Sequence, residues 1–411
     1  MVNGLRLVAL LVIVSFLVSA CGLAEINRQI GIVDDLGEIK GKVDVQSEQT
    51  GPVVVLRFEV KDSVFTLENQ VIATATGQYE FAAEPGEYLV AAFVDVNQDG
   101  RFQRGQEHGN FSTEPMTFRI ESRQTVELET IVISGDPPVL ANGQSAVIAE
   151  SEIVKSIGEV VSLDDPQFNR DNYGMGMWRP VDFLVSVGGG LLFLEEYDAT
   201  KVPVVFVHGI SGGPTDLREL IESLDANKYQ AWVLYYPSGL RLDMVSDYLV
   251  KAITDLQSKY RFEQFDVVAH SMGGLVAHSF VRKYVEGFPD RASQIGLVMT
   301  INSPMGGMTS AASGVDLSPV VVPAWRDVAT DSAFLERLHS KAWPGQIPYH
   351  LVFSYQPGSG GDGVVGLESQ IPLKLQSESV RMYGFANSHV GTLNDPAFIA
   401  LFEGIFQAGG D

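Results

Sequence analysis

The second half of this chain alternates short apolar runs with segments of helical periodicity, and no other feature limits its fold as strongly. The apolar runs occupy residues 191–194, 202–207, 231–236, 265–269, 295–301, 349–355 and 379–384. Between two of them, apolar residues recur every three or four positions over residues 242–256, which predicts a helix with one buried face. Strands that alternate with helices form a mostly parallel sheet with helices on both faces. We therefore predict an α/β domain whose chemistry lies at the carboxyl ends of its strands.

Residues 37–134 follow a different pattern, in which short alternating apolar runs are separated by turn residues. Strands of this length and spacing are typical of a small β-sandwich. The order of the segments 37–43, 77–81 and 85–95 resembles that of carboxypeptidase regulatory-like (transthyretin-like) modules, and this resemblance supports a separate β-module. Residues 135–165 open with Gly-Asp-Pro-Pro and continue with small polar residues, which predicts a linker. The α/β domain is then expected to cover residues 166–411.

Acidic residues outnumber basic ones in this chain. The 51 Asp and Glu residues against 28 Lys and Arg residues give a formal net charge of −23. This balance argues against a nucleic-acid partner, because contacts to phosphate need clustered Lys and Arg side chains. The 45% of hydrophobic residues is that of a folded protein and not of a disordered acidic one. We expect a solvated acidic surface.

The single cysteine, Cys21, directly follows an apolar segment. Residues 7–18 are apolar except for Ser15, and this run is too short to span a bilayer, so it predicts a cleavable signal peptide. Residues 17–21 (Leu-Val-Ser-Ala-Cys) resemble the lipobox of bacterial lipoproteins. The resemblance implies a signal peptide over residues 1–20, lipid on Cys21 and a tether over residues 21–36. Gly22 then implies the outer membrane of a bacterial cell envelope; an ordinary secretory signal is the alternative.

The β-module contains the beginning of a calcium-loop pattern. Asp95, Asn97 and Asp99 alternate and are followed by Gly100, and oxygen side chains at this spacing can wrap a hard cation. Gln106 stands where a calcium loop of the helical type has its last acid, so the segment is not such a loop. A polar β-turn is the alternative to a structural calcium site.

Two serines match a nucleophile-elbow pattern, and their surroundings separate them. Ser211 fits Gly-x-Ser-x-Gly literally but lies in a loop of Gly and Pro residues, whereas Ser271 lies in Ala-His-Ser-Met-Gly-Gly. The elbow needs a buried strand before the serine and a helix immediately after it. Residues 265–269 form such a strand and residues 275–284 such a helix, so we choose Ser271 as the nucleophile. The start of that helix also favours an oxyanion.

The segment 203–210 (Pro-Val-Val-Phe-Val-His-Gly-Ile) together with the Ser271 segment resembles the α/β-hydrolase fold. The similarity is to bacterial lipases with an alanine-type elbow and to the inositol-deacylase-like group. In these families, the residue after His-Gly and the residue after the nucleophile donate two backbone N–H groups to the oxyanion. The matching positions here are Ile210 and Met272. No metal or organic cofactor is expected for catalysis of this kind.

The base and the acid of a serine hydrolase of this fold follow the nucleophile in the order Ser, Asp or Glu, His. Among the histidines after Ser271, we choose His389, because it follows the last predicted strand in a loop; His278, His339 and His350 are less suited. Asp362 stands at the end of the strand 349–355 in Asp-Gly-Val-Val and resembles the acid segment of lipases. Other candidate acids precede that strand and are expected on surface helices: Asp316, Asp327 and Asp331.

Residues 305–345 form a long connection for this fold and predict a cap or lid over the site. Its apolar residues include Trp325 and Leu335, the candidates for substrate contact, although either could belong to an ordinary core. The combination predicts a membrane-anchored serine esterase or lipase that forms an acyl-enzyme. Two alternatives remain open: an acyltransferase or thioesterase with the same triad, and a surface-binding lipoprotein without activity.

Overall fold

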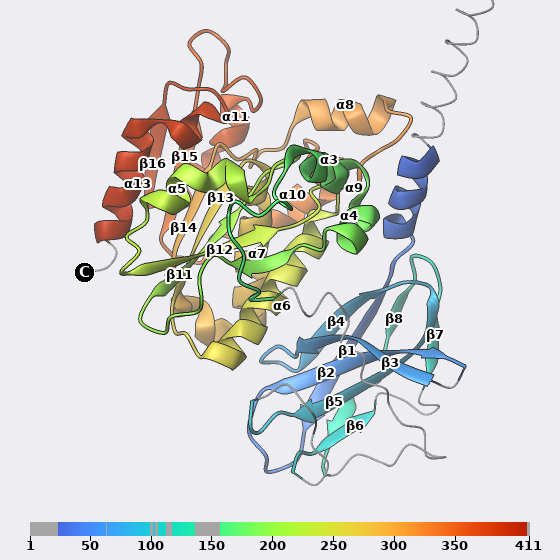
Figure 1. Ribbon diagram of the computed structural model, residues 1–411. Coiled ribbons are helices and arrows are strands. Elements are labelled where there is room, and N and C mark those ends of the chain that lie inside the picture. Colours follow the sequence, from blue (N-terminus) through green and yellow to red (C-terminus); the bar gives the residue numbers. More distant parts are fainter. Residues whose placement is uncertain are drawn as a thin grey trace, which may run out of the picture.

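The structure is a computed structural model that describes residues 24–62, 64–98, 102, 106–111, 117–135 and 157–408. These residues form a β-module and an α/β domain. The β-module lies below the α/β domain in Figure 1. The signal segment, Cys21, Asp99 and most of the predicted linker lie outside the described residues. No helix in the described ranges combines the length and the apolar character needed to cross a membrane.

The β-module is built from two sheets. One has the order β4-β1-β8 with β9 also paired to β1, and comprises β1 (Gly37–Val45), β4 (Gln78–Ala83), β8 (Thr125–Glu127) and β9 (Ile131–Ile133). The other has the order β3-β2-β5-β6 with β7 also paired to β5, and comprises β2 (Val53–Lys61), β3 (Val64–Ile72), β5 (Gly86–Val94), β6 (Gly109–Phe111) and β7 (Phe118–Ile120). Buried and exposed residues alternate along β4, with Tyr79 and Phe81 buried, as expected of a strand with one face on a core.

The α/β domain has a central sheet in the order β10-β12-β11-β13-β14-β15-β16. Its strands are β10 (Gly190–Phe193), β11 (Val202–Val207), β12 (Tyr229–Tyr235), β13 (Phe265–His270), β14 (Ile295–Ile301), β15 (Tyr349–Ser354) and β16 (Arg381–Phe385). All neighbouring pairs are parallel except β10 and β12. This topology and the layers of helices confirm the predicted α/β-hydrolase fold, preceded by a β-rich module.

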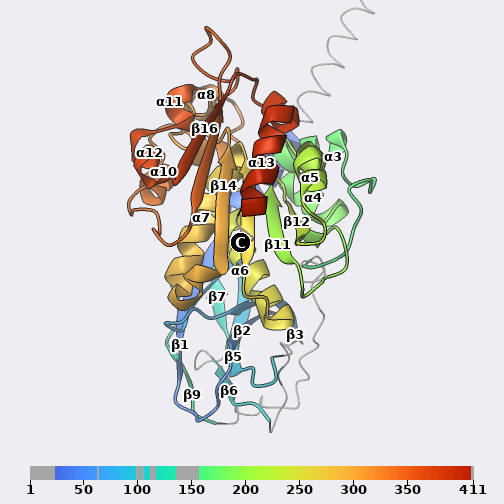
Figure 2. The same cartoon turned by 90° about the vertical axis from the view of Figure 1, so that its left-hand side faces the viewer.

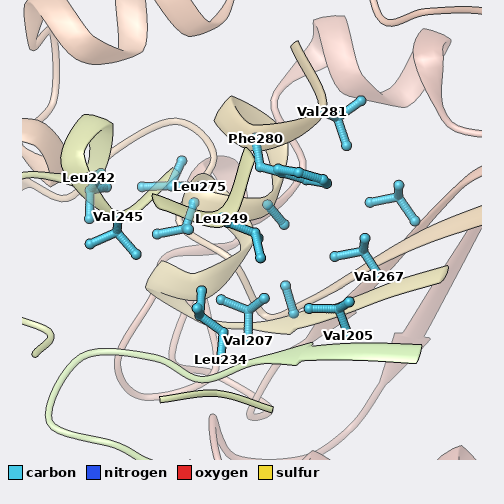
Figure 3. Close-up of a cluster of buried hydrophobic side chains, with 14 of the residues drawn as sticks. Val205, Val207, Leu234, Leu242, Val245, Leu249, Val267, Leu275, Phe280 and Val281 are labelled. Carbon is cyan, nitrogen blue, oxygen red and sulfur yellow. The ribbon is translucent and has the colours of Figure 1, made fainter. Parts of the chain in front are cut away.

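Helices cover both faces of the sheet because side chains along each strand point alternately to one face and the other. On β11, Val205 and Val207 pack with one face of helices α6 (Leu242–Tyr260) and α7 (Met272–Gly287), a core shown in Figure 3. Val204 and Phe206 belong to the opposite core, with residues of α5 (Arg218–Ser223) and α13 (Pro396–Ala408). Figure 2 shows α7 and α13 on opposite sides of β14.

The remaining helices lie before the first strand of the α/β sheet, between β14 and β15, or between β15 and β16. They are α3 (Arg170–Trp178), α4 (Pro180–Ser186), α8 (Thr309–Leu317), α9 (Pro323–Val328), α10 (Ala333–Leu338), α11 (Leu367–Gln370) and α12 (Leu373–Glu378), with short 3-10 turns η1 (Pro214–Leu217), η2 (Pro289–Gln294) and η3 (Gly391–Asn394). Helices α8, α9 and α10 occupy the connection that the sequence predicted as a cap.

Two segment boundaries differ from the sequence-based expectation. Residues 24–34, expected to be a plain tether, form a helix, and Gln29 in this helix is fully buried and hydrogen-bonded to Asp182 of α4. Residues 157–165, expected to end the linker, already belong to the α/β domain, because Val160 pairs with Phe193 of β10. Both segments gain hydrogen-bond partners from elements that are distant in the sequence.

The β-module packs against the end of the α/β domain at which β13 and β14 begin. Ala75 N–H donates to the carbonyl of Gly287 at the end of α7. A cavity of about 620 Å³ lies between the two parts; of the residues that line it, Phe262 lies three positions before β13 and Gln294 directly precedes β14. Parallel strands have their carboxyl ends at the other edge of the sheet, so this cavity is far from the predicted site.

Candidate active site

Ser271 lies on a sharp turn between β13 and α7. Its backbone has φ 55° and ψ −131°, a conformation that non-glycine residues rarely adopt and that stores strain. The turn requires small residues behind it, because a Cβ atom on Gly273 would lie 2.5 Å from the carbonyl oxygens of Val207 and His208. A Cβ atom on Gly274 would collide with the Ser303 side chain. The two glycines therefore let α7 start directly against the ends of β11 and β14.

His389 brings its imidazole to the serine from the loop between β16 and η3. Its Nε2 lies 2.8 Å from Ser271 Oγ, and its Nδ1 lies 2.7 Å from Asp362 Oδ2. Only 6% of Ser271, 7% of His389 and 1% of Asp362 are exposed. The structure thus brings together the three side chains that the sequence singled out, in a geometry in which the ring can accept the serine proton at Nε2.

Asp362 lies in the loop after β15 and is oriented by backbone donors. The N–H groups of Val364 and Val365 donate to its Oδ1 at 2.8 and 2.7 Å, which leaves Oδ2 for His389. Burial raises the pKa of the Asp362 carboxyl, but the hydrogen bonds from His389, Val365 and Val364 outweigh it, and the net effect lowers the pKa. The group is therefore a carboxylate that holds the proton of the ring on Nδ1.

The two predicted oxyanion donors lie beside the serine. Met272 is the first residue of α7, and the first N–H groups of a helix have no partner within it. Ile210 follows Gly209, whose backbone lies so close to the nucleophile that an added Cβ atom would be 2.7 Å from Ser271 Cβ and 3.2 Å from Oγ. Neither N–H group donates a hydrogen bond to any other residue that the structure describes.

His208 supports this loop, a role that the sequence did not reveal. Its ring is buried and stacks on Tyr236, and its Nδ1 lies 2.8 Å from the carbonyl of Gly209. The hydroxyl of Tyr236 donates to the His208 carbonyl at 2.8 Å. Burial lowers the pKa of His208 to about 4, so the ring is neutral at neutral pH. The segment before Ile210 is held by both ring and backbone contacts.

The alternative nucleophile and bases are not part of this hydrogen-bonded series. Ser211 also has a positive φ, but its N–H donates to Ser238 and it has no helix following it directly. His278 is fully buried among Trp343 and Tyr349. His339 Nε2 contacts the Met305 carbonyl, and His350 stacks on Tyr383.

Asp327 was expected on a helix surface, and this expectation is wrong. It is fully buried and binds the Arg241 guanidinium at 2.9 and 3.0 Å. It also accepts the N–H of Leu242 at the start of α6. Asp327 is therefore a structural group that joins α9 to the start of α6, because a buried carboxylate needs a cation and hydrogen bonds to compensate its lost hydration.

The two substrate candidates lie in the connection 305–345 that the sequence predicts as a cap, but they differ in exposure. Trp325 of α9 is partly buried and forms an edge contact with Trp178 at 5.7 Å between ring centroids. Leu335 of α10 is 5% exposed and belongs to the main hydrophobic core of the domain. The structure therefore gives Leu335 a packing role, and neither residue has a contact with Ser271, His389 or Asp362 among the described interactions.

The candidate calcium residues follow β5. Asp95 is buried and Asn97 is exposed, whereas Asp99 lies outside the described residues. The carboxylate of Glu107, also buried, accepts the N–H of Val96. In the described part of the chain, no three His, Cys, Asp or Glu residues are grouped as metal ligands would be. Calcium binding by this turn stays a prediction.

Comparison with family models agrees with the fold. Residues 240–377 match the model of a family described as an alpha/beta hydrolase of unknown function (DUF915). No curated protein sequence matches the chain. A solved structure of the lipase BlEst2 of Bacillus licheniformis is 17% identical over 51% of this chain and 94% of its own, with a TM-score of 0.39. Lipase B of Aspergillus fumigatus is 18% identical over 64% of this chain and 59% of its own, with a TM-score of 0.40. The product of gene lin2722 of Listeria innocua is 18% identical over 49% of this chain and 92% of its own, with a TM-score of 0.39. The sheet order and the strand–turn–helix at Ser271 give the chain an α/β-hydrolase fold, in agreement with this family model.

Proposed function

We propose that this protein is a serine hydrolase that cleaves carboxylic esters, with Ser271 as nucleophile, His389 as base and Asp362 as its orienting acid. The observation that carries the proposal is the continuous hydrogen-bonded series from Ser271 Oγ through both ring nitrogens of His389 to Asp362 Oδ2, at 2.8 and 2.7 Å. A serine hydroxyl becomes an effective nucleophile when a neighbouring base removes its proton.

The reaction follows from these positions. The Ser271 oxygen attacks the ester carbonyl carbon while its proton moves to His389 Nε2, and Asp362 stabilises the imidazolium that results. The oxyanion of the tetrahedral intermediate accepts the N–H groups of Ile210 and Met272, each of which contributes roughly 3 kcal/mol to lowering the barrier. His389 then gives its proton to the leaving alcohol. Water hydrolyses the acyl-enzyme by the same steps and regenerates Ser271.

An apolar acyl group is supported by the surface next to the site. Val364 follows Asp362 by two residues, Val390 directly follows His389, and they are 56% and 60% exposed. An exposed apolar side chain next to a catalytic group can contact an apolar part of a bound ligand. We therefore propose a lipid or other acyl ester as the substrate class.

Membrane attachment is part of the proposal and rests on the sequence. The lipobox-like residues 17–21 support lipid on Cys21, and the anchor would hold the enzyme at the surface of a bacterial membrane that contains its substrates. Incorporation of a radiolabelled fatty acid in a bacterial host tests this step. Incorporation that persists in Cys21→Ala would contradict it.

The activity is tested with p-nitrophenyl esters and a fluorophosphonate probe. We expect the probe to label the protein, and Ser271→Ala to abolish labelling and to lower ester turnover by at least about 10³-fold. Ser211→Ala is the control and should still be labelled. Labelling retained in Ser271→Ala but lost in Ser211→Ala would show that the other serine is the nucleophile. Turnover across acyl-chain lengths then defines the substrate, and acyl transfer to an added alcohol identifies a transferase.

A further inference from the structure

The backbone of His389 is held as firmly as its ring, although it lies in a loop. Its N–H donates to the carbonyl of Asp362 at 3.0 Å. Its carbonyl accepts two side-chain hydrogen bonds, from His270 Nε2 at 3.1 Å and from Asn302 Nδ2 at 2.8 Å. Neither of these donors touches the serine hydroxyl, so the series from Ser271 to Asp362 does not account for them.

The two donors come from neighbouring strands. His270 is the last residue of β13, Asn302 directly follows β14, and β13 and β14 pair so that His270 lies opposite Ile301. The carboxyl ends of adjacent parallel strands lie side by side at the same edge of the sheet. This register explains why two residues far apart in the sequence reach the same carbonyl oxygen.

Asn302 is placed at a cost in free energy. It is fully buried and has φ 51°, in the left-handed region that asparagine tolerates better than most residues. Because a carbonyl oxygen can only accept, the amide nitrogen must face His389, and this leaves Asn302 Oδ1 buried without a partner among the described residues. An unsatisfied buried oxygen costs about 1–3 kcal/mol. The backbone N–H of Asn302 donates to the carbonyl of Val352 of β15, and this hydrogen bond holds the Asn302 backbone in place.

His270 is suited to donate at any pH at which the enzyme would work. Its ring is 5% exposed, and its centroid lies 4.8 Å from that of His389. Burial, together with the nearby His389, lowers the pKa of His270 to about 3. The neutral ring has one N–H, and the carbonyl acceptor requires it on Nε2. A charged ring here would oppose the positive charge that His389 gains during the reaction.

We propose that His270 and Asn302 are positioning residues that jointly hold the His389 carbonyl and thereby keep the base in register with both Ser271 and Asp362. The inference rests on the proposed function of His389. A loop residue must be held to within a fraction of an ångström to transfer a proton efficiently, and a misplacement of about 1 Å can cost 10²-fold in rate. With its carbonyl anchored, the imidazole can turn while the backbone stays in place.

The test uses the full chain and hydrolysis of p-nitrophenyl butyrate, with rates expressed per site titrated by a fluorophosphonate. Asn302→Gly removes the amide but retains access to positive φ, and His270→Phe removes the donor with a ring of similar size. We expect each to lower kcat by about 10- to 100-fold, with KM changed less than about two-fold. Asn302→Asp has no side-chain donor and should lower kcat as much as Asn302→Gly does. His270→Gln retains a donor and should have most of the wild-type kcat.

Thr300→Val is the matched control. Thr300 is buried on β14 and hydrogen-bonds Tyr349 at 2.8 Å, so this variant loses a buried hydrogen bond without touching His389. It should lower the melting temperature and leave kcat per titrated site unchanged. Because His270 and Asn302 share one acceptor, the double variant His270→Phe/Asn302→Gly should depart from the product of the two single effects.

The outcomes separate this proposal from the proposed function. Ester turnover that persists in Ser271→Ala would refute the proposed function itself. If turnover depends on Ser271 while Asn302→Gly and His270→Phe retain wild-type kcat, the positioning role is wrong. Strictly multiplicative losses in the double variant, or a loss of kcat in Thr300→Val as large as in Asn302→Gly, would also overturn it.

Discussion

Asp266 is a carboxyl group in the middle of the central sheet, where charge is costly. It lies on β13, is 4% exposed, and its Oδ1 has no hydrogen-bond partner in the described part of the structure. Burial raises the pKa of Asp266 from 3.8 to about 7, against a smaller lowering by a backbone hydrogen bond from Leu297. The protein therefore folds most favourably with this group protonated.

Asp266→Asn should change how stability depends on pH. In wild type, the unfolded chain loses this proton near pH 4 and the folded chain near pH 7, so the contribution to stability falls as pH rises through this window. We expect the free energy of unfolding of Asp266→Asn, relative to that of wild type, to be roughly 2–4 kcal/mol more favourable to the folded state at pH 8 than at pH 4. Urea unfolding at both pH values measures this. An equal difference at the two pH values would contradict the assignment.

At the scale of single residues, the sequence was enough to predict that Ser271, Asp362 and His389 lie together, because chain order and the ends of strands limit where such groups can stand. It could not reveal that His270 and Asn302 bind the His389 carbonyl. That contact is between side chains and a backbone atom, and it depends on the register of two strands. Nor could it reveal that Asp327 is buried, since its partner Arg241 is far away in the sequence.

The elements were predictable to the extent that their pattern is local. The runs 202–207 and 295–301 coincide with β11 and β14, because strands buried on both faces read as continuous apolar runs. The helix over residues 24–34 has no such pattern and was not predicted. Its stability depends on tertiary contacts such as that of Gln29 with Asp182, which short helices generally require.

The start of α7 is the element on which the site depends most, and one methyl group should disrupt it. We expect Gly273→Ala to lose several kcal/mol of stability and most activity, because its Cβ atom would meet the backbone oxygens of Val207 and His208, which cannot move independently. Gly404→Ala is the control: this exposed glycine of α13 has no atom within 4 Å of an added Cβ. It should be neutral or stabilise by up to about 1 kcal/mol.

Circular dichroism melts and fluorophosphonate labelling compare the two glycine variants. Equal stability and equal labelling of Gly273→Ala and Gly404→Ala would show that α7 can start without the close contact to β11. Both changes add a methyl group to a helix, so a difference between the two variants reports the close contact at the start of α7.

At the scale of the whole molecule, the helix over residues 24–34 connects the N-terminal segment to the α/β domain. Asp34 accepts two hydrogen bonds from Arg326 of α9, at 2.9 and 3.0 Å, and Gln29 exchanges two with Asp182 of α4. The β-module, in contrast, contacts the end of the domain where β13 and β14 begin. If Cys21 is lipidated as proposed, the lipid is attached three positions before Ala24, the first described residue of this helix. Three residue steps, each at most about 3.6 Å, would then hold α4 and α9 close to the membrane.

Gln29→Ala should release this helix and leave the chemistry unchanged. The side chain is fully buried with both its polar groups paired to Asp182, so its loss should cost about 1–3 kcal/mol locally. We expect amide hydrogen exchange over residues 24–34 to accelerate by about 5- to 100-fold, with kcat for a soluble ester unaffected. Arg28→Ala is the control, because its ion pair with Glu25 is exposed and contributes little. Unchanged exchange in Gln29→Ala, or equal acceleration in both variants, would show that the helix is held by contacts other than those of Gln29.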